Sequence, residues 1–256
     1  MSLFKFNITG LLSKETTFIL NYMKDNYDWK DIENKLFDYG LTSSRKRSYV
    51  IVHQIKKRIN KKFDNLPCIE DLIHLANSKV SSLTKSQVYY VFLYNSDKIF
   101  SNIMDSIFQI YDHNKKNPVI TRSDVKSLLT NYLNYFDKEF NEKTKQNWIG
   151  KFISILKEIN MFIERGRHTY LINIGEITYE TWTFFTLHTI NNNYDLNEAL
   201  FIKAFHILPS HIQLIIKRGK NRNWITYNTS KFDGNKINIT LKSNFKNIKE
   251  WLERIN

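Results

Sequence analysis

Lysine and arginine side chains cluster in one stretch of the chain, residues 43–63, which reads SSRKRSYVIVHQIKKRINKKF. Eight of these residues are Lys or Arg, and none is Asp or Glu. Such a set of cations is suited to binding phosphate, whereas an ordinary solvated helix mixes charges of both signs. The apolar spacing predicts a helix over 44–62, with Ser43 or Ser44 as its N-cap. The polar residues expected on its outer face, in contact with phosphate, are Lys46, Arg47, Gln54, Lys57, Arg58 and Lys61.

A second set of polar side chains lies on a predicted helix over 143–160. Its apolar residues, from Trp148 to Ile159, fall in one sector and predict a core face. Lysine and amide side chains near the start of a helix can bind phosphates and base edges in the major groove of DNA. The outward-facing residues with this chemistry are Lys143, Gln146, Asn147 and Lys151.

A predicted β-hairpin follows that helix directly. Two short β-prone runs, 161–163 and 169–172, flank a polar tip that contains a glycine. The tip carries Arg165, Arg167 and His168, cations or potential cations placed to reach a neighbouring phosphate backbone or minor groove. Helix, loop, helix and hairpin are the element order of a winged helix–turn–helix. A helical domain closed by a hairpin that binds nothing is the alternative, and such arrangements also mediate protein contacts.

A third group of cations lies in the segment KRGKNRNW, between a predicted helix and a predicted strand. Four of its eight residues are basic. Their position fits either a further DNA contact or a solvated turn. The residues are Lys217, Arg218, Lys220 and Arg222.

The remaining pattern predicts a mainly α fold. Helical periodicity covers most of the first 160 residues, without an alternating strand pattern. Helices near 195–206 and 209–218, strands near 223–228 and 236–242 and a closing helix at 244–255 are expected afterwards. The predicted domains are a helical domain over 1–112 with the basic helix, a winged helix–turn–helix over 119–175, and a helix–helix–hairpin–helix unit over 195–256. A second winged-helix-like unit is one interpretation of the last of these.

Composition favours a polyanionic partner. The chain has 256 residues, 42% of them hydrophobic, and 38 Lys and Arg against 25 Asp and Glu give a net charge of +13. Nucleic acid or an anionic membrane surface is the partner class that this balance favours, although a coding bias toward lysine also raises it. The single cysteine excludes an intramolecular disulfide and a cysteine-based zinc site. Without a long apolar run or a cleavage signal, we expect a cytoplasmic protein and no membrane contact.

Catalytic motifs are missing from the sequence. It contains no Walker loop, dinucleotide fingerprint, HExxH motif or nucleophile elbow. His206 and His211 are five residues apart, which is not the spacing of a helical metal pair. Asp233 and Gly234 predict a turn better than a metal site. We therefore expect no enzymatic activity, catalytic residue, metal, cofactor or small-molecule substrate.

Several short motifs resemble the BrxA family of BREX bacteriophage-exclusion systems. They are FNITGLLSKET near the start, YDWKDI, the basic helix ending in Arg58-Ile59, and KTKQNWIGKFISILKEINMFI before the hairpin. The likeness covers most of the chain and weakens after about residue 175. The family's basic helix often carries arginine and glutamate where this chain has Val50 and Gln54, so contacts at those positions do not carry over.

The resemblance implies a mostly helical, winged-helix DNA-binding protein without known catalytic residues. Such a protein acts beside larger defence enzymes in the bacterial cytoplasm, and other BREX proteins are its candidate protein partners. The leading hypothesis is a duplex-DNA-binding accessory protein with weak sequence preference. A protein-interaction adaptor is the alternative from another class, and similarity of the family to the NusB-like fold keeps RNA binding open. The donor-rich helix beside a basic hairpin favours DNA, because an adaptor has no need of it.

Overall fold

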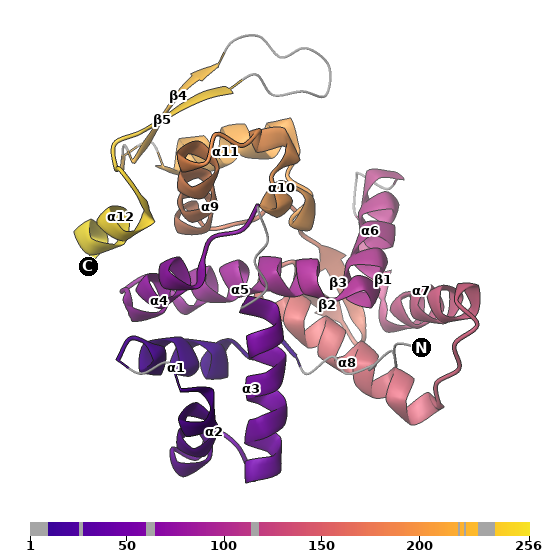
Figure 1. Cartoon of the computed structure of the whole chain (residues 1–256). Coiled ribbons are helices and arrows are strands. Elements are labelled where there is room, and N and C mark those ends of the chain that lie inside the picture. The colour runs from indigo at the N-terminus through magenta and orange to yellow at the C-terminus, as the bar shows by residue number, and fades with distance from the viewer. Residues whose placement is uncertain are drawn as a thin grey trace. The chain divides into compact units, whose positions relative to one another are not determined.

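The computed structural model is mainly helical, as the sequence predicts, and carries a small antiparallel sheet (Figure 1). It describes residues 10–25, 28–59, 65–113, 118–219, 221–222, 224–229 and 239–256. The chain divides into two compact units. Unit 1 contains Leu93–Ile174 with the described residues up to Leu11, and unit 2 contains Leu12–Phe92 and Gly175–Asn256. The predicted range 119–175 thus lies almost wholly in unit 1, which also takes in residues 93–118.

The first half of unit 2 is a group of helices joined by short connections. Asp28 caps α2 by accepting a hydrogen bond from the Lys30 backbone N–H at 2.9 Å, and Ser44 Oγ accepts one from the Arg47 N–H at 3.2 Å at the start of α3. These side chains satisfy backbone donors that the first helical turn leaves free. The helices are α1 (Ser13–Met23), α2 (Trp29–Asp38), α3 (Arg45–Ile59), α4 (Ile69–Asn77) and α5 (Ser82–Ser96), the last of which continues into unit 1.

The second half of unit 2 contains helices and a hairpin. Its elements are α9 (Tyr179–Asn191), the short 3-10 helix η1 (Leu196–Glu198), α10 (Leu200–Ala204), α11 (Pro209–Gly219), strands β4 (Ile225–Thr229) and β5 (Ile239–Ser243), and α12 (Ile248–Ile255). The two strands pair antiparallel, with Tyr227 opposite Leu241. The predicted turn at Asp233 and Gly234 lies outside the described residues.

Helix α9 was not among the elements predicted from the sequence. Every residue from Tyr179 to Leu187 except Glu180 is buried. A helix buried on all sides has no polar stripe, so helical periodicity cannot reveal it. The Gln87 side chain of α5 fixes the start of α9, because its Oε1 accepts hydrogen bonds from the Thr178 N–H and the Thr181 hydroxyl, each at 2.9 Å.

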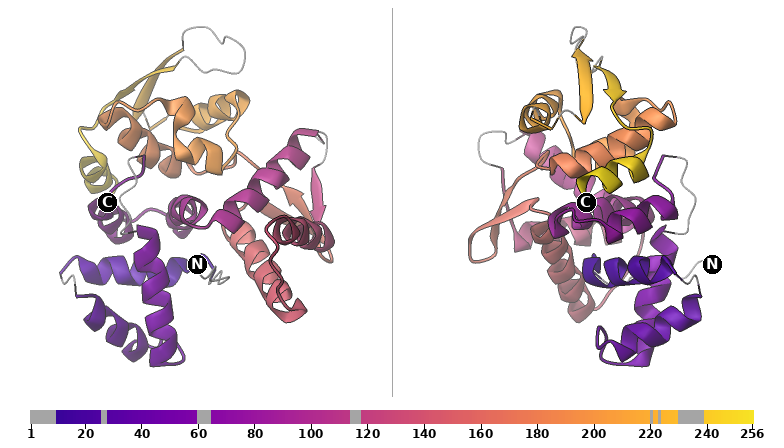
Figure 2. Two further views of the ribbon diagram at one scale, coloured as in Figure 1. Left: turned by 45° about the vertical axis from the view of Figure 1, so that its right-hand side comes forward. Right: turned by 90° about the vertical axis from the view of Figure 1, so that its left-hand side faces the viewer.

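Unit 1 places three helices beside a three-stranded sheet. The elements are α6 (Lys98–His113), β1 (Val119–Thr121), α7 (Arg122–Tyr135), α8 (Glu142–Glu158), β2 (Phe162–Gly166) and β3 (Thr169–Ile172). The strand order is β1-β3-β2, all antiparallel, with Leu171 between Val119 and Ile163. Strand β1 corrects the expectation of no strand before residue 160. The hairpin β2–β3 extends outward from the helices of this unit (Figure 2).

The core of unit 1 holds α8 in place. The predicted apolar sector of α8 is buried from Trp148 to Leu156, and the rings of Phe100 and Phe152 lie 4.9 Å apart. Trp148 stacks on Phe152 at the same centroid distance. Burial of such rings contributes several kcal/mol each, on the order of the 3–5 kcal/mol lost on truncation to alanine. The polar face of α8 is thereby fixed toward solvent.

His188 in α9 makes the stability of the protein depend on pH. Burial lowers the pKa of its imidazole from the usual 6.5 to about 4, and its Nε2 has no hydrogen-bond partner among the described residues. Between about pH 4 and pH 6.5 the His188 imidazole therefore binds a proton in the unfolded chain but not in the folded chain. We expect stability to be constant above about pH 6.5 and to fall by about 2 kcal/mol on acidification to pH 4, since solvent screens part of the full shift.

Urea unfolding at a series of pH values checks this prediction. Burial also lowers the pKa of His211, which acts in the same direction. The comparison that isolates His188 is therefore wild type against His188→Gln, which cannot titrate. Parallel stability curves for the two proteins between pH 7 and about pH 4 would contradict the prediction.

Candidate nucleic-acid interface

An open cleft of about 420 Å³ lies in unit 1, where the start of α7, one face of α8 and the hairpin tip meet. It gathers an amide, three hydroxyl groups and the basic side chains of the hairpin and α7. The sequence analysis named Gln146, Arg167 and His168 of this set. The lining residues are Thr121, Arg122, Ser123, Lys126, Gln146, Arg167, His168 and Thr169.

The start of α7 is fixed by a capping box. Thr121 Oγ1 accepts a hydrogen bond from the Asp124 N–H at 3.2 Å, while Asp124 Oδ2 accepts one from the Thr121 N–H at 2.8 Å. The hairpin tip is attached to the same turn, because the Arg122 N–H donates to the His168 carbonyl oxygen at 2.9 Å. His168 adopts a φ of 61°, a left-handed conformation that closes the tight turn. The tip is therefore held against α7.

Arg122 joins α7 to α8. Its Nη2 donates to the backbone carbonyl oxygen of Gln146 and to Gln146 Oε1, both at 3.2 Å. A methyl group added at Gly150 would lie 3.8 Å from this nitrogen, so the α8 backbone passes close to the guanidinium. Because the Gln146 oxygen is occupied, its amide Nε2 remains as a donor without a partner among the described residues.

The cations of the cleft differ in how far they are already neutralised. Lys126 Nζ lies 2.9 Å from Glu142 Oε2, and Lys145 lies 3.3 Å from the other oxygen of that carboxylate. Hydrogen bonds from the two lysines hold the pKa of Glu142 below its usual value. Arg167 is exposed and forms no ion pair with a described residue. Arg167 is thus the guanidinium group of the cleft that is most accessible to an anion, whereas Arg122 is half-buried, forms no ion pair with a described residue and donates to Gln146 through Nη2 alone.

Four further predicted contact residues of unit 1 lie outside the cleft lining. On α8, Lys143, Asn147 and Lys151 are exposed, as expected from the helical spacing, and Arg165 is exposed on β2. Lys157 at the end of α8 pairs with Glu164 of β2 at 2.5 Å, which ties the helix to the hairpin. The exposed residues extend the polar surface along the outer face of α8.

Sequence reasoning missed the contribution of α7. Thr121, Arg122, Ser123 and Lys126 all line the cleft, and none was predicted as a contact. The signal was present, because TRSD at 121–124 is a threonine with an acidic residue three positions later, typical of a helix start. Helix starts point free N–H groups and positive potential outward, so the cations beside one are natural anion contacts.

On α3, the exposed face lies at a different position around the helix axis from the face predicted from the sequence. Arg58 is only 7% exposed, so the expectation that it lies on the outer face is wrong. Ser48 joins the buried side through a 2.5 Å hydrogen bond between its hydroxyl and that of Thr42. Lys46 and Lys57 are exposed as predicted, Arg47 and Gln54 are half-buried, and Lys61 lies outside the described residues. The exposed residues that were not predicted are Arg45, Tyr49, His53 and Lys56.

The third predicted group is largely engaged within unit 2. Arg218 forms a bidentate ion pair with Glu176, in which both N···O distances are 2.7 Å. These hydrogen bonds hold the pKa of the Glu176 carboxyl below its usual value. Arg222 pairs with Glu180 and lies 4.9 Å from the centre of the Trp224 ring. Lys217 is exposed, and Lys220 lies outside the described residues. Both arginines therefore have carboxylate partners already.

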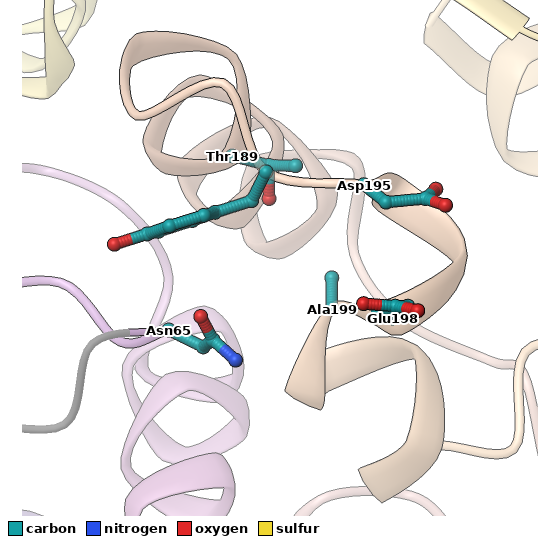
Figure 3. A pocket seen from close by; sticks show the side chains of 6 residues that line it. Asn65, Thr189, Asp195, Glu198 and Ala199 are labelled. Carbon is teal, nitrogen blue, oxygen red and sulfur yellow. The ribbon is translucent and has the colours of Figure 1, made fainter.

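A smaller cavity of about 60 Å³ in unit 2 has the opposite character (Figure 3). Asp195 and Glu198 place two carboxylates at its wall, beside Asn65, Thr189, Tyr194 and Ala199. Asp195 Oδ1 is occupied as the cap of η1, because it accepts a hydrogen bond from the Asn197 N–H at 2.8 Å. Two carboxylates repel phosphate, so this cavity is unsuited to nucleic acid.

Metal sites and membrane-spanning helices are both absent from the described part of the chain. No three His, Cys, Asp or Glu side chains come together there in a way that holds a metal ion. None of the helices in those residues has the length and apolar character needed to cross a bilayer. The cleft of unit 1 and the face of α3 are thus the surfaces to be explained.

Comparisons of the chain with protein-family models, with curated proteins and with solved structures find no match.

Proposed function

We propose that this chain is a non-enzymatic protein that binds duplex DNA with weak sequence preference. The observation that carries the proposal is the cleft of unit 1, where Arg122, Gln146 and Arg167 come from three different elements. Two guanidinium groups suit phosphate oxygens, and the free amide donor of Gln146 suits a base edge.

The element order of unit 1 supports a winged helix–turn–helix. The order α6-β1-α7-α8-β2-β3, with strands arranged β1-β3-β2, gives a helix pair followed by a hairpin. In that reading α8 is the recognition helix, α7 precedes it, and the hairpin is the wing. The cleft then lies where the wing and the start of α7 approach the backbone of a duplex whose major groove holds α8. The order α11-β4-β5-α12 in unit 2 suggests a second winged-helix-like unit.

Weak sequence preference follows from the balance of contacts. Arg122, Arg167 and the exposed Lys143 and Lys151 offer charge, which binds every duplex alike. Gln146 and the exposed Asn147 are the two amides placed to read base edges, and each well-placed pair discriminates by about 1–3 kcal/mol. Two such contacts are fewer than a highly selective protein uses.

The resemblance to the BrxA family leads us to propose a role as an accessory protein of a BREX phage-defence system. The resemblance rests on short motifs, one of which, KTKQNWIGKFISILKEINMFI, spans α8 and the start of the hairpin. Other proteins of that system are then the proposed protein partners, and the bacterial cytoplasm is the proposed location.

Fluorescence anisotropy with random-sequence duplexes tests the proposed function. We expect log K to fall linearly with log salt between about 50 and 200 mM, and affinities for different duplexes to lie within about 10³ of one another. Binding of structured RNA in preference to duplex, or no duplex binding at the lowest salt, would contradict the proposal.

A further inference from the structure

The exposed face of α3 has a composition that the proposed duplex contact does not explain. At about 100° per residue, its exposed side chains fall within an arc of about 120°. Four of them are cations and two are aromatic rings. They are Arg45, Lys46, Tyr49, His53, Lys56 and Lys57.

The two rings lie in the middle of this face. Tyr49 is 56% exposed, and its ring is nearly parallel to that of His53, with an angle of 18° and 6.1 Å between centroids. The Tyr49 hydroxyl has no hydrogen-bond partner among the described residues. A large aromatic side chain this exposed, next to a second one, leaves π-faces and edges open to a flat ligand.

Cations lie at both ends of the ring pair. Arg45 and Lys46 precede Tyr49 by about one turn, and Lys56 and Lys57 follow His53 by about one turn. The face is therefore about 18 Å long from end to end. Helix α3 contains no Asp or Glu, so its positive potential is not offset from within the helix.

Two of these cations are held in place by α2. The Arg45 guanidinium lies 5.7 Å from the centre of the Phe37 ring, and Lys56 Nζ lies 5.1 Å from the centre of the Trp29 ring. Such cation–π contacts leave the charge in place while limiting the number of side-chain conformers. Lys46 and Lys57 have no ion-pair partner among the described residues and remain available to phosphate.

We propose that the α3 face binds single-stranded nucleic acid, with bases stacked on Tyr49 and His53 and phosphates beside the flanking cations. Stacking on aromatic rings within a cationic track is how proteins hold unpaired strands without sequence preference. A duplex cannot use the rings in this way, because its base faces are covered by neighbouring pairs unless a step is unstacked. This site shares no residue with the cleft of unit 1 and does not depend on the proposed duplex binding.

The test measures anisotropy of the whole chain with labelled oligothymidylate and oligouridylate, and with a duplex. Tyr49→Leu keeps an apolar side chain and a good helix former while removing the ring. We expect it to weaken single-strand binding by about fivefold or more, since a stacked base contributes about 1–3 kcal/mol. Tyr49→Phe should stay within about twofold of wild type. Tyr135→Leu is the matched control, because Tyr135 on α7 is 81% exposed.

The flanking cations give a second, independent measurement. Replacing Lys46 and Lys57 by glutamine should reduce the slope of log K against log salt for single strands by about 1.4, or about 0.7 for each lost phosphate contact. Similar affinities for the two oligonucleotides, or a preference for either, support the proposal and show whether the 2′-hydroxyl is read.

Three results would overturn it. The first is that wild type binds neither oligonucleotide even at the lowest salt. The second is that Tyr49→Leu leaves single-strand affinity unchanged. The third is that Tyr49→Leu weakens single-strand and duplex binding equally. The Arg122→Gln, Arg167→Gln double variant separates this proposal from the proposed function. It should lose duplex affinity and keep single-strand affinity, whereas a parallel loss of both would indicate one shared site and contradict an independent α3 site.

Discussion

Replacement of both Arg122 and Arg167 by glutamine is expected to weaken duplex binding by about 10²-fold. A hydrogen bond to a charged group contributes about 1.5–3 kcal/mol, so two lost arginine–phosphate contacts amount to about 3 kcal/mol or more. The salt dependence should change as well, because each phosphate neutralised contributes about 0.9 to the slope of log K against log salt. The slope should therefore shrink by about 1.8, and the loss should be similar for all duplex sequences.

The matched control uses the two arginines that already form ion pairs with carboxylates within unit 2. Arg218→Gln with Arg222→Gln removes the same number of charges from the chain, but those guanidinium groups bind Glu176 and Glu180. We expect its salt slope to equal that of wild type. Its stability should fall only slightly, because exposed ion pairs contribute about 0–1 kcal/mol each. Equal slopes for the two double variants would mean that net charge alone, and not the cleft, determines binding.

Gly175→Ala is expected to lower the free energy of unfolding by about 3 kcal/mol. Gly175 has a φ of 71°, and a Cβ there would lie 2.1 Å from Nδ1 of His211. The left-handed conformation costs about 1 kcal/mol for a residue with a side chain, and overpacking adds about 1–3 kcal/mol. The imidazole cannot move aside freely, because its Nδ1 accepts a hydrogen bond from the Leu208 N–H at 3.1 Å. Urea unfolding, or a fall in Tm of about 6–12 °C, would register the change.

Gly40→Ala separates the two contributions. Gly40 has nearly the same φ, 68°, but nothing lies within 4 Å of the position that its Cβ would occupy. Its replacement should cost only about 1 kcal/mol, the conformational part. The difference between the two variants, about 2 kcal/mol, measures the steric conflict with His211. Equal losses would show that the His211 ring gives way.

Local signals in the sequence were enough to predict most helices. The predicted helices over 143–160 and 209–218 end within two residues of the bounds of α8 and α11, because caps and periodicity act within a few residues. Strand β1 was not predicted, because three residues are too few to show an alternating pattern and its pairing partner β3 lies about 50 residues later in the chain. The largely buried helix α9 was not predicted for another reason: it has no polar face, so its sequence shows no hydrophobic periodicity.

The candidate sites depended more on tertiary structure. Charge alone suggested that Arg58 faces solvent and that Arg218 and Arg222 are available. The packing of α3 buries the first, and carboxylates about 42 residues earlier in the chain engage the other two. Gln146 and Arg167 were predicted from element order and do line one cleft. The helix-start signal TRSD pointed to Arg122, but the contact of Arg122 with Gln146 follows only from the placement of α7 beside α8.

The division of the chain into units also has a consequence for synthesis on the ribosome. Unit 1 consists of Leu93–Ile174 and residues up to Leu11, all of which are made by residue 174, whereas unit 2 needs both Leu12–Phe92 and Gly175–Asn256. Gln87 accepts a hydrogen bond from the Thr178 N–H, and the Tyr90 hydroxyl donates one to the Ala204 carbonyl oxygen, 114 residues later in the chain. Both side chains are therefore synthesised well before their partners. At about 5–20 residues per second, the last 82 residues take roughly 4–16 s to make. During that interval unit 1 can already fold, while the first helices of unit 2 still expose their apolar faces. We therefore expect chaperones of nascent chains to bind mainly within residues 12–92.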